Sequence, residues 1–541
     1  MRYVLLFAFG LFGCVSNKPT DSLPTYTIGA SLNTIDDRIF GAFFEKATWS
    51  GEIGSDAAIS LRSGVVFPEV KEYMAWMQIP LLRYPGGTAV DYYPWYNLID
   101  SMPGHHGTRP RNAHVLDPTQ GGIVESDGRM GLHEYMVLCR ELGIEPQLVV
   151  NLGEGYYHPE RLLEAAEQMG ADFVRYCNDT SGPWAELRAH NGHPAPFGVK
   201  YWQIGNETWL FEGLKYDERT EAAKARLTES ILTYARAMRT ADASIVLIAD
   251  GAEGLGDGVR AAAPGLIDYY TFHAYTPWGI GEVKRHDEPV AADTVDPAEV
   301  WRGLVAAPRI DPVTGQSRLD PWAYQSLPTD QPLALTEWNW NGWFSGKAKA
   351  ARPANELLAY GLGSAGFLHG ILRESGRIRL ANQSMLVGTN WHINGIRVDT
   401  TEAMRPYMHP SAMVTGLYRR QHGNELLDCE VTNAHYYAQP LTLGNLGPLP
   451  KVAEQDVVVT ADGGAYYLHI INRAYAETRA LRFVFPEPVA KTVTHYLLSD
   501  RSPGTRSPYA AIETPMLRAT KRRTIIHVPP RSVSVVRVAR R

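Results

Sequence analysis

Two glutamates in this chain each follow directly on a short apolar stretch. VKYWQIG leads into Asn206 and Glu207, and PLALT leads into Glu337. A carboxylate taken out of water is costly unless it is paired or used in a reaction. Two carboxyl groups held about 5–5.5 Å apart, one protonated and one ionised, suit retaining glycoside hydrolysis. This chemistry predicts Glu207 as the general acid/base and Glu337 as the nucleophile.

Other polar and aromatic side chains occur at similar points, where an apolar run ends. They are Glu45 after IFGAFF, Arg83 after IPLL, Asn151 after LVV, His273 and Tyr275 in YYTFHAY, Trp338 after Glu337, and Asn382 and Gln383 in RLANQ. The carboxyl ends of the strands form the active face of a β/α barrel, so these side chains are expected to surround the two glutamates. Asn206 is predicted to hydrogen-bond a sugar 2-OH, Tyr275 to donate to Glu337, and Trp338 to face a sugar ring.

Each of these residues also has a purely structural interpretation. Glu207 could stabilise the N-terminus of a helix through the helix dipole. Glu45 could form an ion pair with Arg83, His273 could orient a neighbouring side chain, and the aromatic residues could serve packing alone. The catalytic interpretation therefore depends on the convergence of several strand ends. No Cys/His spacing typical of zinc is found in the sequence, and neither a metal nor a cofactor is predicted.

The elements that must position these side chains alternate along the middle of the chain. Short apolar runs such as PQLVVNLG and SIVLIADG alternate with amphipathic stretches, in one of which Leu227, Ile231, Tyr234 and Met238 mark a single helical face. Continuous apolar strands are typical of parallel sheets that are buried on both faces. Residues 38–415 are therefore predicted to form the catalytic domain, a (β/α)₈ TIM barrel of the α/β class.

The pattern changes after the barrel. VVVTADGGAYYLHIINR alternates with a period of two around an Asp-Gly-Gly turn, and RALRFVFPEP, TVTHYLLS, RTIIHVPP and SVSVVRV are further strand candidates. We therefore predict an all-β, antiparallel β-sandwich over residues 416–541. TYTIGAS, within residues 24–37, is predicted to add an N-terminal strand to this sandwich.

Residues 1–23 have the pattern of an export signal and tether. Met1-Arg2 precedes the apolar run YVLLFAFGLFG, which is too short to span a bilayer as a helix. LFGC resembles a bacterial lipobox, which predicts lipidation and membrane anchoring at Cys14; the alternative is a plain signal peptide cleaved nearby. The expected location is secreted, periplasmic or anchored at the outer membrane of a bacterium.

Composition narrows the classes of partner. The 541-residue chain is 45% hydrophobic, which is ample for a large core, and its net charge of −6 is unlike the basic excess of nucleic-acid binders. We therefore expect no nucleic-acid partner, and the paired carboxylates predict a carbohydrate substrate. Three cysteines other than Cys14 are far apart in sequence, and Cys139 and Cys177 fall in apolar helical patterns, which predicts buried thiols.

The same segments resemble glycoside hydrolase family 51, the α-L-arabinofuranosidase type of clan A. The resemblance is carried by IDDRIFGAFFE, LLRYPGG, LVVNLGEG and RYCNDTSGPWAELRAHNGHPAPFGVKYWQIGNE, and DYYTFHAY, LALTEWNW, THYLL and VPPRSVSVVRV continue it in the same order. It implies a barrel with a β-sandwich, retaining hydrolysis without a cofactor, and frequent homo-oligomers. It also implies roles for particular residues: Glu207 as acid/base, Glu337 as nucleophile, Glu45, Arg83, Asn206, His273 and Tyr275 around them, and Gln383 as a sugar-binding glutamine.

One position departs from the family pattern. The family usually has Asn directly after RYPGG, where this chain has Thr88. A site built around sugar hydroxyls discriminates strongly through such hydrogen-bond partners, so the mechanism carries over more directly than the substrate. The leading hypothesis is an exo-acting α-L-arabinofuranosidase. The alternatives are an exo-glycosidase or endo-glycanase of the same clan acting on another sugar, and, more remotely, a non-catalytic glycan-binding lipoprotein, which would be expected to have lost the two carboxylates.

Overall fold

The computed structural model describes most of the chain. The described residues are 23–46, 52–100, 113–117, 122–126, 128–324, 327, 331–399, 401–499, 511–515, 517–520 and 522–541. Within these ranges, no helix combines the length and the apolar character needed to cross a bilayer. The predicted signal and Cys14 lie outside the described residues. Cys139 and Cys177 are buried thiols, as predicted.

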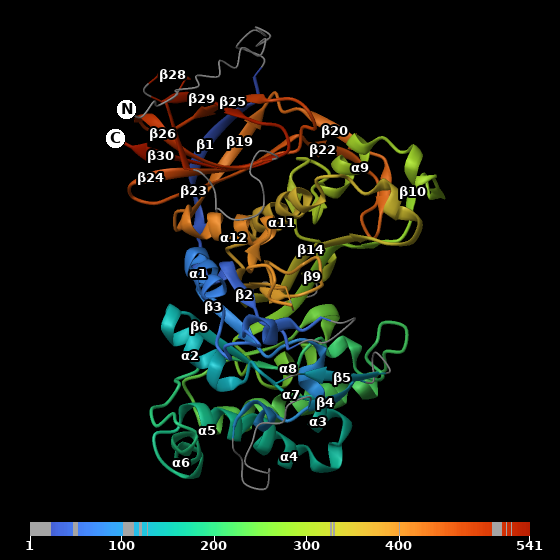
Figure 1. The fold of residues 1–541 in the computed structure, drawn as a ribbon, viewed down its shortest axis with the longest axis vertical. Helices are drawn as coiled ribbons and strands as arrows, with labels where there is room; N and C mark the ends of the chain where they lie inside the picture. The colour runs from blue at the N-terminus through green and yellow to red at the C-terminus, as the bar shows by residue number, and fades with distance from the viewer. Residues whose placement is uncertain are drawn as a thin grey trace.

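Eight strands close into a barrel, which confirms the predicted fold class (Figure 1). In chain order they are β2 (Gly41–Phe43), β3 (Leu81–Tyr84), β6 (Glu145–Val150), β7 (Tyr201–Ile204), β8 (Val246–Asp250), β9 (Tyr269–Ile280), β14 (Leu333–Phe344) and β15 (Ile378–Gln383). All eight neighbouring pairs are parallel, and β15 closes the barrel against β2. One expected strand is shorter than predicted, because Ile39 and Phe40 of IFGAFF lie in a 3₁₀ turn that precedes β2.

Helices connect the strands and cover the outside of the barrel. They are α1 (Pro68–Met77), α2 (Leu132–Leu142), α3 (Gly153–Tyr157), α4 (Leu162–Ala165), α5 (Asp172–Asn178), α6 (Pro183–His190), α7 (Glu221–Ala241), α8 (Asp257–Ala262), α9 (Pro297–Leu304), α10 (Pro321–Tyr324), α11 (Glu356–Arg373) and α12 (Pro410–Arg420). Helix α7 begins where the Thr220 hydroxyl accepts from the Ala223 amide, and it buries the predicted face that includes Leu227 and Ile231. A π-helical segment, Ala166–Ala171, joins α4 to α5.

The interior of the barrel is built in layers. Its apolar layer consists of Leu81, Tyr201, Ile248, Ala334 and Leu380, which form a separate cluster. Side chains two residues apart on a strand share one face, so the next layer comes two residues further along the same strands. That layer is polar and fully buried: Arg83, Gln203, Asp250, Thr336 and Asn382. Each of these strands therefore places a polar side chain near one end of the barrel, two residues after an apolar one.

The second part of the chain is a ten-stranded sheet. Its order is β27-β26-β30-β24-β23-β19-β1-β25-β29-β28. The bounds are β1 (Thr25–Thr34), β19 (Glu425–Thr432), β23 (Gln455–Ala461), β24 (Ala465–Asn472), β25 (Arg479–Val484), β26 (Val489–Leu498), β27 (Ala511–Pro515), β28 (Leu517–Thr520), β29 (Arg523–Val528) and β30 (Ser532–Arg540). Strand β1 pairs antiparallel with β19 and parallel with β25, so the start of the described chain lies within the C-terminal sheet (Figure 1). Val493 of β26 and Ile526 of β29 belong to one apolar cluster, so the two halves of the sheet enclose a common core, as in a sandwich.

Smaller sheets occupy the loops. They are β4 (Ala113–Asp117) with β5 (Gly122–Ser126); β10 (Val283–Arg285) with β11 (Glu288–Pro289) and β21 (Leu441–Leu443); β12 (Arg309–Ile310) with β13 (Ser317–Arg318); β16 (Val387–Gly388) with β17 (Ile396–Arg397) and β18 (Tyr407–Met408); and β20 (Tyr436–Gln439) with β22 (Leu449–Ala453). Strand β21 follows α12 in the chain but pairs with β10 from a barrel loop, so the two parts of the protein are interleaved.

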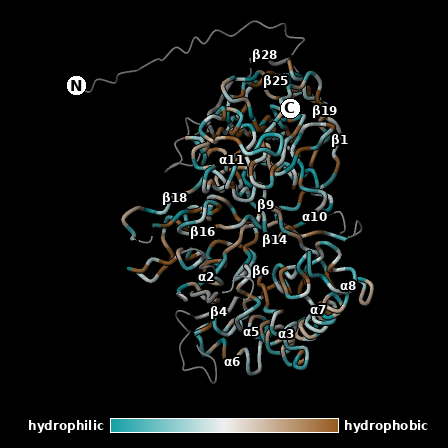
Figure 2. The backbone as a smooth tube through the Cα atoms, turned by 90° about the vertical axis from the view of Figure 1, so that its right-hand side faces the viewer, coloured by the Kyte–Doolittle hydropathy of each residue, from teal (hydrophilic) through white to brown (hydrophobic). Residues whose placement is uncertain are grey.

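Helix α11 lies between the barrel and the C-terminal sheet, and the turned view shows the same arrangement (Figure 2). It is buried on nearly every side, which explains its high proportion of apolar and small residues. Its neighbour α12 spans the predicted domain boundary at residues 415 and 416. A buried ionic cluster joins the two parts, in which Asp456 of β23 accepts from Arg373 of α11 at 2.6 Å and from Arg473 at 3.2 Å.

Candidate active site

Two glycines shape the loop that follows β3. Gly86 and Gly87 have φ values of +48° and +68°, a region that favours glycine. A Cβ atom at Gly87 would lie 1.9 Å from Oε1 of Glu45, and a Cβ atom at Gly86 would lie 2.1 Å from the ring of Phe43. The Pro-Gly-Gly turn therefore lets the loops after β2 and β3 meet closely, and it places the predicted site residue Glu45 beside the mouth of the barrel.

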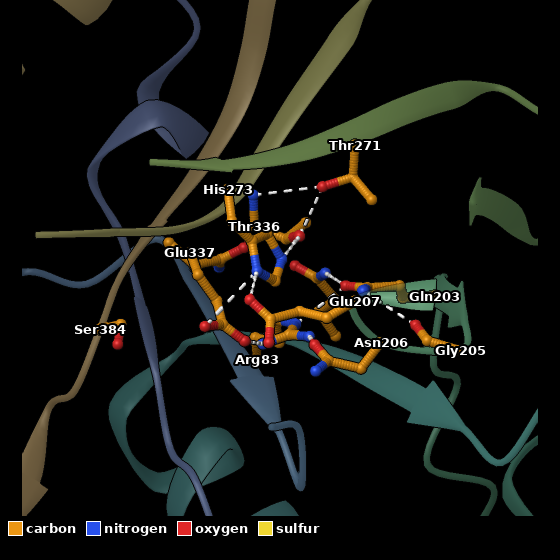
Figure 3. Close-up of polar contacts among 12 residues, drawn as sticks. Arg83, Gln203, Gly205, Asn206, Glu207, Thr271, His273, Thr336, Glu337 and Ser384 are labelled. Atoms are coloured by element: carbon orange, nitrogen blue, oxygen red, sulfur yellow. Dashed lines mark hydrogen bonds and ion pairs between the residues drawn. The ribbon is translucent and has the colours of Figure 1, made fainter. Parts of the chain in front are cut away.

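Glu337 on β14, the seventh barrel strand, is held at both carboxylate oxygens. Arg83 Nη1 donates to its Oε1 at 2.9 Å (Figure 3). The Tyr275 hydroxyl donates to its Oε2 at 2.7 Å. Burial by itself raises the pKa of this carboxyl. The charges of His273 and Arg83, together with the hydrogen bonds from Tyr275 and Arg83, outweigh burial and lower the pKa below its usual value. Glu337 is therefore the group that stays ionised.

Glu207 follows β7, the fourth barrel strand, in a left-handed backbone conformation with φ of +47°. Its Oε1 lies 2.9 Å from Nδ1 of His273, and its side chain makes no capping hydrogen bond to the short 3₁₀ turn that follows. Burial raises the pKa of the Glu207 carboxyl, and the negative charge of Glu337 adds to this, against the opposing effect of His273. Of the two glutamates, Glu207 is therefore the one that holds a proton at higher pH.

His273 lies between the two glutamates. Its Nδ1 is 2.9 Å from Glu207 and 3.5 Å from Glu337, and its Nε2 is 3.0 Å from the Thr336 hydroxyl (Figure 3). Burial lowers the pKa of this imidazole, but the two carboxylates outweigh burial and raise it. Because Thr336 fixes the far side of the ring, His273 orients Glu207 as well as influencing its charge.

Two buried amides point to a ligand. Asn206 Oδ1 accepts from Arg83, and its backbone N–H donates to Asp91 at 2.9 Å, but its Nδ2 has no hydrogen-bond partner among the described residues. Nε2 of Gln383, at the end of β15, is also buried without a partner in the described part of the chain. A buried N–H group without a partner is costly, so these two donors are suited to a polar ligand such as a sugar hydroxyl.

Two further strand-end amides have structural roles. Asn151 Nδ2 donates to the Tyr93 carbonyl at 3.0 Å, and Asn151 Oδ1 accepts from the Glu154 amide at 2.9 Å. Asn382 Nδ2 donates to the Ala42 carbonyl at 3.3 Å, across the β15–β2 seam. Thr88 begins the 3₁₀ turn that follows Gly87 and is partly exposed.

Trp338 does not lie with the other predicted site residues. Its side chain is fully buried and stacks on Phe367 of α11, with ring centroids 5.5 Å apart. The pairing of β14 with β9 shifts register between Leu335 and Glu337. This irregularity allows Thr336 and Glu337, although consecutive, both to contact groups inside the barrel, and Trp338 then faces outward. The expectation that Trp338 faces a sugar ring is therefore corrected.

The structure adds residues that the strand-end pattern did not single out. Gln203 accepts from Arg83 Nε at 2.8 Å, and the Ser384 hydroxyl lies 2.7 Å from that of Tyr275. The indole of Trp209 lies edge-on to His273, with ring centroids 5.2 Å apart. A polar Gln inside the apolar strand YWQI was a usable signal for Gln203. Nothing local in the sequence distinguishes Ser384.

Asp91, in the loop after β3, ties three loops together. Its Oδ1 accepts from the amides of Leu152 and Gly153 at 2.8 and 3.3 Å, and its Oδ2 accepts from the amide of Asn206 at 2.9 Å. Burial raises the pKa of Asp91 to about 7, against the lowering effect of these three hydrogen bonds. Asp91 therefore positions the Asn206–Glu207 segment through its backbone.

We expect Asp91→Asn to weaken both the fold and the reaction. One carboxylate oxygen becomes an NH₂ group, which cannot accept from a backbone N–H, so the free energy of unfolding should fall by about 1–3 kcal/mol. Displacement of Asn206 should lower kcat roughly 10-fold to 100-fold. Urea unfolding and steady-state kinetics measure the two effects, with the exposed Asp217→Asn as the matched control. Unchanged kcat in a destabilised variant would limit Asp91 to a role in stability.

The two glutamates and His273 are close enough together to suggest a metal site. One side-chain atom each from Glu207, His273 and Glu337 lie within 4.8 Å of one another. Arg83 adds a permanent positive charge beside Glu337, and the Tyr275 hydroxyl occupies its second oxygen. Both features oppose a cation and favour a neutral ligand that can donate and accept hydrogen bonds.

This chain is similar in sequence to known α-L-arabinofuranosidases. The profile of the α-L-arabinofuranosidase 1 domain matches residues 73–288. A probable α-L-arabinofuranosidase C of Aspergillus flavus is 26% identical over 391 residues, which are 68% of this chain and 69% of that protein. The intracellular exo-α-(1→5)-L-arabinofuranosidase 1 of Bacillus subtilis is 28% identical over 256 residues, 45% of this chain and 46% of that protein. The chain spans 69, 66 and 57% of three Aspergillus relatives.

Solved structures share the fold over almost the whole chain. The α-L-arabinofuranosidase of Thermotoga maritima, in complex with arabinose, superposes with a TM-score of 0.66 at 20% identity, covering 96% of this chain and 99% of that one. The family 51 arabinofuranosidase of Xanthomonas axonopodis pv. citri gives a TM-score of 0.68 at 18% identity, covering 95% and 99%. At such identities the likeness establishes the arrangement of barrel and sheet.

Proposed function

This chain belongs to glycoside hydrolase family 51, and from that premise we propose that it is a retaining, exo-acting α-L-arabinofuranosidase. The observation that carries the proposal is the pair of glutamates on strands four and seven. A carboxylate oxygen of Glu207 and one of Glu337 lie within 4.8 Å of each other. Retaining glycosidases need their two carboxyl groups about 5–5.5 Å apart, whereas inverting enzymes need room for a water between them.

Each carboxyl group has the protonation state that its role requires. Glu207 protonates the leaving oxygen, while Glu337 attacks the anomeric carbon and forms a glycosyl-enzyme. Glu207, now ionised, then takes a proton from the water that releases the sugar. The raised pKa of Glu207 and the lowered pKa of Glu337 support this division of labour. Arg83 and Tyr275 hold the nucleophile, and His273 holds the acid.

The unpartnered donors support a sugar as the ligand. Asn206 Nδ2 and Gln383 Nε2 are available to hydroxyl groups beside the two carboxylates. Glu207 is the more accessible glutamate, with 20% of its side chain exposed against 8% for Glu337, as expected if the leaving group departs toward solvent on the Glu207 side. Thr88, where the family usually has Asn, favours one second candidate: the same mechanism on a different terminal sugar.

The N-terminal sequence supports a location for this activity. The apolar run that precedes Cys14 favours export from a bacterial cytoplasm and attachment to a membrane through lipid on that cysteine. Substrates would then be oligosaccharides or polysaccharides outside the cytoplasm.

Release of free sugar tests the proposed function. The purified protein is incubated with a panel of aryl glycosides and with arabinose-bearing polysaccharides, and the released sugars are identified. We expect arabinose, liberated one residue at a time from non-reducing ends. Release of another monosaccharide would change the sugar assigned as substrate and leave the proposed mechanism unchanged. Release of oligosaccharides alone would overturn the exo assignment, and no release from any substrate would overturn the enzyme assignment.

The pH dependence should report the two glutamates separately. Glu207 must be protonated, so kcat/KM should fall as the pH rises through its raised pKa; Glu337 must be ionised, so kcat/KM should fall as the pH drops through its lowered pKa. Fluoride needs little protonation to leave. With α-L-arabinofuranosyl fluoride the alkaline limb should therefore flatten while the acid limb remains. An alkaline limb that is equally steep for both classes of substrate would contradict the acid role of Glu207.

A further inference from the structure

Strands β9 and β14 run side by side beyond the closed part of the barrel (Figure 1). Their pairing continues past the catalytic residues, with Asn341 opposite Trp278 and Phe344 opposite Ile280. Tyr275, whose hydroxyl donates to Glu337, lies at the base of this ribbon. Residues further along the ribbon are therefore placed at the rim of the active site.

The ribbon carries a series of aromatic rings that starts at the nucleophile. The rings of Tyr275 and Trp278 lie edge to face with centroids 5.5 Å apart, and Trp278 and Trp343 repeat the same geometry at 5.5 Å. Trp278 is 53% exposed, and it is the only exposed tryptophan among those whose exposure the structure describes. An exposed tryptophan leaves a large apolar face in water, and such faces frequently mark binding sites.

The position of Trp278 is fixed by a segment from after the barrel. The Asn445 side chain accepts from the Trp278 amide at 2.6 Å and donates to the Tyr275 carbonyl at 3.2 Å. Asn445 follows β21, which is paired with β10 just beyond β9. Gly444 has φ of +62°, and a Cβ atom there would lie 2.4 Å from the Gly279 carbonyl. The ribbon is thus braced from behind while the indole stays exposed, and a rigid aromatic face binds a ligand with little loss of conformational entropy.

We propose that Trp278, backed by Trp343 and held by Asn445, is a stacking platform for the sugar on the leaving-group side of the scissile bond. This proposal rests on the proposed function. The terminal sugar lies over Glu337 and Asn206, so the remainder of the substrate must pass over the rim. The apolar face of a sugar ring fits an aromatic face there, while its hydroxyl groups stay in water. The substrate class is therefore an oligosaccharide or polysaccharide rather than a small arabinoside.

Trp278→Ala tests the platform. The readout is the ratio of kcat/KM on an α-(1→5)-linked arabino-oligosaccharide to kcat/KM on α-L-arabinofuranosyl fluoride, which has no sugar on the leaving-group side. We expect the ratio to fall roughly 10-fold in Trp278→Ala, mainly through KM on the oligosaccharide. Trp278→Phe keeps an aromatic face and should recover most of the ratio. Tyr436→Ala, a similarly exposed aromatic residue on β20, is the control and should leave the ratio unchanged.

The outcomes separate this proposal from the proposed function. Arabinose released from the fluoride by the wild type supports the proposed function independently of Trp278. An unchanged ratio in Trp278→Ala, whether both rates are retained or both fall equally, would then overturn the platform alone. No arabinose from either substrate in the wild type would overturn the proposed function and the platform with it.

Discussion

Glu337→Gln should abolish turnover, lowering kcat/KM on arabinofuranosides on the order of 10⁴-fold or more. An amide cannot replace the carboxylate as the nucleophile that forms the glycosyl-enzyme. Its carbonyl oxygen keeps one acceptor for Arg83 or Tyr275, so we expect the variant to fold. Initial rates over a range of substrate concentrations measure the first effect, and circular dichroism with a thermal melt measures the second.

Glu229→Gln is the matched control for this change. Glu229 is exposed on α7 and is not among the buried residues of that helix. The control should retain wild-type rates. If Glu337→Gln kept more than about 1% of wild-type activity with a native melting profile, Glu337 would be excluded as the nucleophile, because removal of a covalent nucleophile costs far more than this.

Glu207→Ala should show an effect that depends on the leaving group. With poor leaving groups, such as another sugar, kcat should fall about 10²-fold to 10⁴-fold, the usual contribution of a general acid. With arabinofuranosyl fluoride the first step should stay fast, so that the glycosyl-enzyme accumulates and a burst of fluoride precedes the steady state. Stopped-flow measurement of fluoride release, beside steady-state rates on oligosaccharides, separates the two cases.

Azide provides the complementary measurement for Glu207→Ala. The small anion needs no general base, so it should attack the accumulated glycosyl-enzyme, restore turnover and give an arabinosyl azide with retained configuration. Wild-type enzyme should show no such acceleration, because Glu207 already activates water. An equal loss of rate on fluoride and on oligosaccharides, without azide rescue, would assign Glu207 to positioning rather than to acid catalysis.

The sequence by itself determined the barrel and much of its polar layer. Parallel strands buried on both faces are short and apolar, and side chains alternate across a strand. Arg83 lies two residues beyond Leu81, and Gln203 lies two residues beyond Tyr201. Local geometry therefore turns Arg83 and Gln203 into the barrel. The hairpin β23–β24 followed in the same way from period-two alternation around an Asp-Gly-Gly turn. Glu207 and Glu337 were identifiable as strand-end carboxylates because the carboxyl ends of parallel strands share one face.

Only the tertiary structure decided which side chains meet. The register shift in β14 turns Glu337 inward and sends Trp338 to α11, and no local pattern in LALTEWNW encodes it. Asp91 accepts from the amide of Asn206, 115 residues away. Asn445 contacts the backbone of Trp278 and Tyr275, 167 and 170 residues away. The difference in pKa between Glu207 and Glu337 likewise depends on Arg83, His273 and Tyr275, which come from other strands. Local sequence fixes alternation and hydrophobicity, whereas electrostatic environment and close contact depend on which distant segments the fold brings together.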